Sequence, residues 1–188
     1  MIKVIKLVIS VLICEGAGFL GSIFTAPAIP KWYALIEKPG FNPPNWIFMP
    51  VWTILFFLMG VSLYLVWEKK AAVSVSSRDA GAKFWNPISA KFWAGSWKEE
   101  NVIMVFALQL FLNVLWSAIF FGLKAPDLAF FEILMLWVAI IYTIANFHRV
   151  SKAAAFLLLP YLLWVSFAAV LNLCIWLLNW GSLTVFHI

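Results

Sequence analysis

Five long runs of apolar residues divide the sequence, and they constrain its fold more than any other feature. A helix needs about 20 mostly apolar residues to cross the hydrocarbon core of a bilayer. The runs cover residues 4–26, 46–67, 102–123, 128–147 and 153–180, and none shows the alternation of a membrane β-strand. We therefore expect an all-α integral membrane protein, in which residues 1–188 form a single domain built as a bundle of five transmembrane helices.

Composition excludes two classes of protein. The chain is 65% hydrophobic and only 11% charged, which is more apolar surface than a soluble domain of this size could bury. Its net charge of +5 comes from basic residues spread between the apolar runs, so we expect no nucleic acid as a partner. The first run is too long for a cleaved signal peptide and contains Glu15, which predicts that it is retained as a helix.

The basic residues predict an orientation. One side of the predicted bundle has only Lys31, Lys38 and Lys124. The other side has Lys3, Lys6, Lys69, Lys70, Arg78, Lys83, Lys91, Lys98, Arg149 and Lys152. Because positive charge concentrates in cytoplasmic loops, the N-terminus is expected in the cytoplasm and the C-terminus outside, in a plasma membrane of bacterial or archaeal type.

The loops differ in kind. Residues 27–45 form a stiff loop rich in proline, whereas residues 68–100 form a long basic loop in which AKFW occurs twice. Lysine beside Phe-Trp favours the bilayer interface, and a docking site for partners is the alternative. The connections 123–127 and 148–152 are short, so the last three spans should be antiparallel neighbours. Asp127 and Ser151 are the expected N-caps of the last two helices.

Polar and aromatic residues recur at helical spacing inside the spans. Gln109, Asn113 and Trp116 share one face of the third span. Hydrogen bonds between helices are the favoured interpretation of such amides, and a polar cavity wall is the alternative. For Glu15 and Glu132 a structural role and a functional role are equally expected, because a carboxylate within the membrane is costly and often marks a functional site.

Tryptophan is unusually abundant, with twelve copies. Many lie at the ends of spans, as in an aromatic belt, but Trp52, Trp116 and Trp164 lie within them. Their flat rings suit either a flat apolar ligand or simple packing. Pro160 should kink the fifth helix next to Trp164. Catalytic motifs are missing, neither histidine has a partner at metal-ligand spacing, and no required cofactor or metal is predicted.

Three stretches carry the pattern of a known family, and they are WYALIEKPGFNPPNWIFMPVWTILF (32–56), LQLFLNVLWSAIFFG (108–122) and LLLPYLLWVSFAAVLNLCIWLLN (157–179). They resemble the TspO/MBR family of tryptophan-rich sensory proteins and translocator proteins, also called peripheral-type benzodiazepine receptors. With GFLGSIFT (18–25), they cover nearly the whole chain in the family's order. The resemblance implies a five-helix bundle, a homodimer, and a ligand cavity closed by the first loop.

The resemblance also implies a ligand and a site. Family members bind porphyrins such as protoporphyrin IX, haem and benzodiazepine-type ligands, and are described as sensors or transporters of tetrapyrroles. The residues that match the family's pocket are Tyr33, Trp52, Asn113, Trp116, Trp164 and Ala168, and those expected in the cavity lid are Pro43, Pro44, Trp46 and Phe48. The tyrosine and basic residue of the sterol-recognition pattern are missing from 169–180.

Several functions remain open at this point. The first is a membrane receptor or sensor for tetrapyrroles, and a variant of this hypothesis adds their transport across the membrane. The alternative is an enzyme-like role, in which Trp52 and Trp164 support the light- and oxygen-dependent degradation of bound porphyrin. Scaffolding through residues 68–100 and proton-coupled transport through Glu15 or Glu132 are further alternatives.

Overall fold

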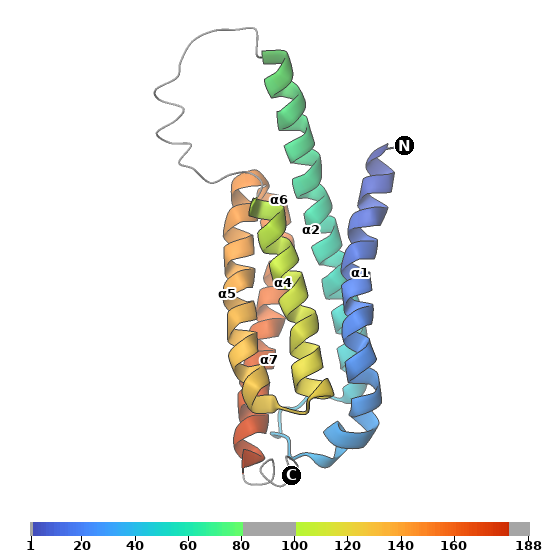
Figure 1. Cartoon of the computed structure of the whole chain (residues 1–188), viewed down its shortest axis with the longest axis vertical. Coiled ribbons are helices and arrows are strands. Elements are labelled where there is room, and N and C mark those ends of the chain that lie inside the picture. The colour runs from blue at the N-terminus through green and yellow to red at the C-terminus, as the bar shows by residue number, and fades with distance from the viewer. Residues whose placement is uncertain (1, 81–100, 181–188) are drawn as a thin grey trace.

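The protein is a bundle of long helices that run alternately up and down (Figure 1). The computed structural model describes the backbone of residues 2–80 and 101–180, and the side chains of residues 3–70 and 102–180. Every regular element in these residues is helical. In chain order they are α1 (Ile2–Ala28), the π-helical turn η1 (Ile29–Tyr33), α2 (Asn45–Ala80), α4 (Asn101–Ser117), the π-helical turn η2 (Ala118–Gly122), α5 (Pro126–Val150), α6 (Lys152–Leu157) and α7 (Leu159–Leu178).

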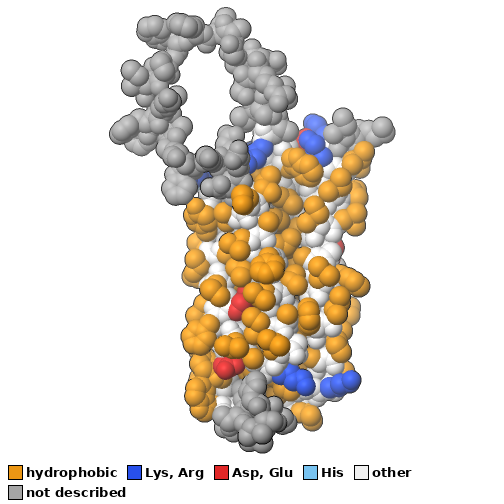
Figure 2. Space-filling model, in the orientation of Figure 1, with side chains coloured by type: hydrophobic (Ala, Val, Ile, Leu, Met, Phe, Trp, Pro, Cys, Tyr) orange, Lys and Arg blue, Asp and Glu red, His pale blue; other side chains and the backbone are white. Residues whose placement is uncertain are grey.

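The described helices confirm the predicted fold class. Five of them are long and apolar enough to cross a membrane, namely Lys3–Tyr33, Asn45–Lys70, Val102–Gly122, Pro126–Val150 and Lys152–Leu178. Large apolar side chains cover the face seen in Figure 2 between two ends that carry basic residues. Such a surface suits lipid, because lipid solvates apolar side chains as well as a protein core does. The predicted orientation of the chain in the membrane stays a prediction.

Two helices extend beyond their predicted ends. Residues 27–33 were expected in the first loop, but α1 continues to Ala28 and η1 then runs to Tyr33. Pro30 stands in the first turn of η1, where a missing backbone N–H is best tolerated. Likewise α2 continues to Ala80 through the start of the predicted basic loop, because the sequence has no proline or glycine between Gly60 and position 81. Residues 81–100, with both AKFW segments, lie outside the described residues.

The last span is interrupted near its start, as its proline predicts. Helix α6 ends at Leu157 and α7 begins at Leu159, one residue before Pro160. The Ser151 prediction is confirmed, because its side chain accepts a hydrogen bond from the backbone N–H of Ala154 at 3.4 Å. The Asp127 prediction is wrong. Ala125 is the N-cap of α5, without a side-chain cap, and Asp127 lies in the first turn because Pro126 begins the helix.

The spans form a closed ring. Helix α1 packs between α2 and α4, α4 packs on α5, and α5 packs on α7, while α6 packs on α2. The expected neighbours among the last three spans are therefore confirmed. Close approach of α1 and α2 depends on Gly60, where an added Cβ would lie 2.6 Å from the Cα of Val11. The ring leaves room inside it near the loop that joins α1 to α2.

Candidate functional site

An apolar cavity of about 600 Å³ lies among α1, α2, α4 and α7. This volume is within the range of small-molecule sites, which are mostly apolar with a few placed polar groups. Aromatic side chains make up much of its wall, and they are Phe19, Tyr33, Trp46, Phe48, Trp52, Phe56, Trp116, Phe120, Phe121, Trp164 and Phe167. The cavity therefore offers several flat apolar faces to a ligand.

The structure brings the predicted ligand-binding residues together. Tyr33, Trp52, Asn113, Trp116, Trp164 and Ala168 come from three helices and one π-helical turn, and all of them line this cavity. Of the four residues predicted for the lid, Trp46 and Phe48 line it and Pro43 and Pro44 do not. These two prolines instead form the turn before α2, where the Pro44 carbonyl accepts from the Ile47 N–H at 3.0 Å. Binding of a ligand by these residues stays a prediction.

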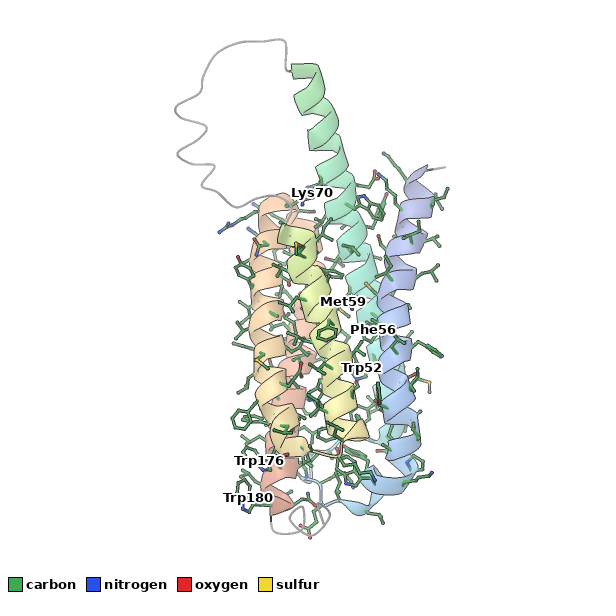
Figure 3. All side chains as sticks on the ribbon, viewed as in Figure 1. Trp52, Phe56, Met59, Lys70, Trp176 and Trp180 are labelled. Atoms are coloured by element: carbon green, nitrogen blue, oxygen red, sulfur yellow. The ribbon has the colours of Figure 1, made fainter. Side chains whose placement is uncertain are left out.

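Helical spacing on α2 builds one wall of the cavity. Trp52 and Phe56 are four residues apart, and their ring centroids lie 5.6 Å from each other. With Met59 they follow one another along α2 (Figure 3). Across from them, α1 presents Gly18, where an added Cβ would lie 2.5 Å from the Phe56 ring. The absence of a side chain at this glycine thus makes room for Phe56.

Hydrogen bonds hold the polar and aromatic wall of α4 against its neighbours. The Asn113 Nδ2 group donates to the Tyr161 hydroxyl at 2.9 Å. The Trp116 indole N–H donates to Asn172 Oδ1 at 3.1 Å, and Asn172 Nδ2 donates to the Pro126 carbonyl at 2.6 Å. These bonds connect three helices, α4, α5 and α7, through side chains that are buried or partly buried. They order the wall before any ligand arrives, which lowers the entropic cost of binding.

The loop of residues 34–44, which we call the lid loop, is tied down at several points. The Tyr33 hydroxyl donates to Asn42 Oδ1 at 2.6 Å, across the loop. The Lys38 ammonium donates to the carbonyls of Tyr33 and Ile36 at 2.7 and 2.6 Å. It also lies 5.0 Å from the centre of the Tyr33 ring. The lid loop is therefore ordered by its own polar side chains as well as by its prolines.

The cavity opens sideways between α1 and α2. Three of its lining side chains are themselves exposed on the outside of the bundle, Phe19 by 68%, Trp46 by 72% and Met49 by 79%. Hydroxyl groups at this opening are bonded within their own helices, since Ser22 donates to the Phe19 carbonyl and Thr53 to the Met49 carbonyl. In a membrane this opening faces lipid, where a bonded hydroxyl costs less than a free one.

Many residues of the cavity wall were absent from the predicted site, and three of them bear on its chemistry. Glu15, Phe56 and Asn172 line the cavity, and each shares a helical face with a small or aromatic residue of the wall. That periodicity could have indicated them, but it cannot separate a cavity wall from ordinary packing. Glu132 does not line the cavity. It is buried in α5, and neither of its carboxylate oxygens has a hydrogen-bond partner among the described residues.

Comparisons with known proteins agree with this geometry. The model of the TspO/MBR family matches residues 10–177. A protein of Archaeoglobus fulgidus named tryptophan-rich protein TspO is 42% identical over 94% of this chain and 99% of its own length. The human translocator protein is 33% identical over 87% of this chain and 83% of its own length. A tryptophan-rich sensory protein of Cereibacter sphaeroides is 29% identical over 80% of this chain and 78% of its own length.

Proposed function

The chain belongs to the TspO/MBR family, and from this premise we propose that it is a membrane receptor that binds tetrapyrroles, such as protoporphyrin IX or haem, in the cavity. The resemblance noted in the sequence is confirmed by the family match, and the chain is a multi-pass integral membrane protein. Relatives named as sensory and translocator proteins support a role in sensing or transport. Binding of benzodiazepine-type ligands and a homodimeric state belong to the same proposal.

One observation carries this proposal, namely that indole and phenyl rings surround a single apolar cavity. A tetrapyrrole is a large flat aromatic molecule, and such rings attract it by stacking or edge-to-face contact. Phe48 contacts both Tyr33 and Trp164 edge-on, with ring centroids 6.4 and 6.2 Å apart. The first turn of α2 thus places an aromatic residue where it touches two walls of the cavity.

Polar groups that are free of other partners support the same ligand. Among the described residues, no hydrogen bond is made by the indole N–H groups of Trp52 and Trp164 or by the side-chain carbonyl of Asn113. All three residues line the cavity. They offer two donors, which suit the carboxylates of protoporphyrin IX or haem, and one acceptor. The sideways opening would admit such a ligand from the bilayer, where an apolar molecule concentrates.

A titration in the dark tests the proposal. The purified full chain is titrated with protoporphyrin IX in detergent while the porphyrin absorbance band is followed. We expect saturable binding that is weakened several-fold in Trp52→Phe, Asn113→Ala and Trp164→Phe. Trp137→Phe is the control, because the Trp137 indole on α5 donates to the Ser166 hydroxyl on α7, and neither residue lines the cavity. Binding that does not saturate, or that ignores all three cavity changes, would contradict the proposal.

Light-dependent porphyrin oxidation is the second candidate function. Its specific support is that oxidisable rings adjoin one another at the cavity, with the centroids of Trp52 and Tyr161 6.4 Å apart. Dioxygen would be the oxidant and the bound porphyrin the reductant. The same samples are therefore illuminated in air. New porphyrin products that vanish in Trp52→Phe or Trp164→Phe, while dark binding persists, would favour this second function over binding alone.

A further inference from the structure

Glu15 gives the cavity an acidic wall. It lies near the middle of the first span, in α1, and its side chain lines the cavity. It is the only acidic residue among the lining residues that the structure describes, and no lysine, arginine or histidine is among them. The charge inside the cavity therefore favours a cationic group over an anionic one.

The Glu15 carboxyl has no partner of its own. Among the described residues it makes no hydrogen bond and no ion pair, whereas Glu68, in α2, pairs with Lys6 at 2.9 Å. A carboxylate within a membrane span is costly when it is unpaired, and in known proteins it pairs or marks a ligand pathway. The space beside Glu15 is the cavity itself, so a ligand can supply the missing partner.

Aromatic rings next to Glu15 favour the same kind of ligand. Gly18 lies one turn below Glu15 on α1, and the Phe56 ring packs against it. The Trp52 ring follows Phe56 along the same wall. The faces of such rings attract a cation, and the attraction is stronger where water is excluded. The Glu15 carboxyl and the rings of this wall thus both favour a cationic ligand.

We propose that the cavity binds flat apolar ligands that carry a protonated amine, and that Glu15 is the residue that selects them. This inference rests on the proposed function, because it concerns the ligand of the same cavity. The amine forms a charge-assisted hydrogen bond to the Glu15 carboxylate, while the apolar body lies against the Trp52 and Phe56 rings. A tetrapyrrole in this cavity turns its own carboxylates away from Glu15.

Three pyrenes that carry different polar groups at the same ring position test the proposal. The full chain is placed in nanodiscs of phosphatidylcholine and titrated with 1-pyrenemethylamine, 1-pyrenemethanol and 1-pyrenecarboxylate, and energy transfer from tryptophan to pyrene is recorded. Empty nanodiscs correct for partition into lipid. We expect the amine to bind about 10- to 100-fold more tightly than the alcohol, and the carboxylate to bind least tightly.

Matched variants assign the preference to one residue. Glu15→Gln should remove the preference for the amine over the alcohol, and a cooperative thermal unfolding transition reports that the variant is folded. Glu15→Asp should keep part of the preference. Glu132→Gln is the control, since Glu132 is buried outside the cavity wall, and it should keep the full preference. A wild-type chain that binds amine and alcohol equally, or a preference that survives in Glu15→Gln, overturns the proposal.

The dark titration with protoporphyrin IX separates this proposal from the one on which it rests. Porphyrin binding without any preference among the pyrenes overturns only the role of Glu15. A Glu15-dependent preference for the amine without porphyrin binding overturns only the tetrapyrrole ligand.

Discussion

The side chain of Asn179 holds the backbone of Glu37 at two points. Its Oδ1 atom accepts from the Glu37 N–H at 3.0 Å, and its Nδ2 group donates to the Glu37 carbonyl at 2.9 Å. The two residues are 142 positions apart in the chain. One amide at the end of α7 therefore ties the lid loop to the last helix and satisfies both polar groups of one peptide residue.

Asn179→Ala should loosen the lid loop. The change removes both bonds to Glu37, and each lost hydrogen bond costs about 0.5–1.5 kcal/mol. We expect faster hydrogen exchange of the amides of residues 34–44 and faster release of bound porphyrin. Asn146→Ala is the control, because the Nδ2 group of Asn146 donates only within its own helix, to the Tyr142 carbonyl. Equal exchange in both variants would contradict the role of Asn179.

Gly60→Ala should destabilise the packing of α1 on α2. The new Cβ would lie 2.6 Å from the Cα of Val11, and a backbone atom cannot move aside without shifting its helix. Overpacking of this kind costs about 1–3 kcal/mol. Gly16→Ala is the control on the opposing helix, where nothing lies within 4 Å of the new Cβ, and it should be neutral or stabilising. Thermal unfolding in detergent compares the two, and equal midpoints would contradict the packing argument.

Gly18→Ala should act on binding more than on stability. Its new Cβ would lie 2.5 Å from the Phe56 ring, which is a side chain and can move toward the cavity. We expect weaker binding of protoporphyrin IX with a small change in unfolding temperature. Replacing Phe56 with Leu in the same chain should restore part of the affinity, because the smaller side chain leaves room for the new methyl group. Unchanged affinity in Gly18→Ala would contradict this prediction, because it would show that Phe56 does not move into the cavity.

Glu132→Leu should stabilise the protein. Glu132 is 3% exposed, and among the described residues neither of its carboxylate oxygens has a hydrogen-bond partner. Burying a polar group without a partner costs about 1–3 kcal/mol in protein mutational data, and a leucine of similar size removes that cost. Thermal unfolding of the variant measures the gain. A loss of stability would instead indicate that this carboxyl is bonded in the membrane, for example to a bound water.

Much of the candidate site could be predicted from the sequence through the family resemblance. Trp52, Asn113 and Trp164 were named in this way, and the structure places them around one cavity. Phe56 and Asn172 were not named, although helical spacing puts both on the same faces. Spacing indicates which residues share a face of a helix, but it does not indicate whether that face meets a neighbour or an empty space. Pro43 and Pro44 were assigned to the lid and do not line the cavity, because stiff residues shape a loop without having to touch its ligand.

The five membrane spans of this chain follow from its sequence alone. That inference is local, because an apolar run of about 20 residues in a bilayer must satisfy its backbone within one helix. The turns of the chain follow similar local rules, as Ser151 and Pro160 illustrate. The position of the cavity, its opening toward lipid and its closure by the lid loop could be seen only in the folded structure. These features depend on contacts between distant residues, such as Gly60 with Val11 and Asn179 with Glu37, which set the spacing and rotation of whole helices.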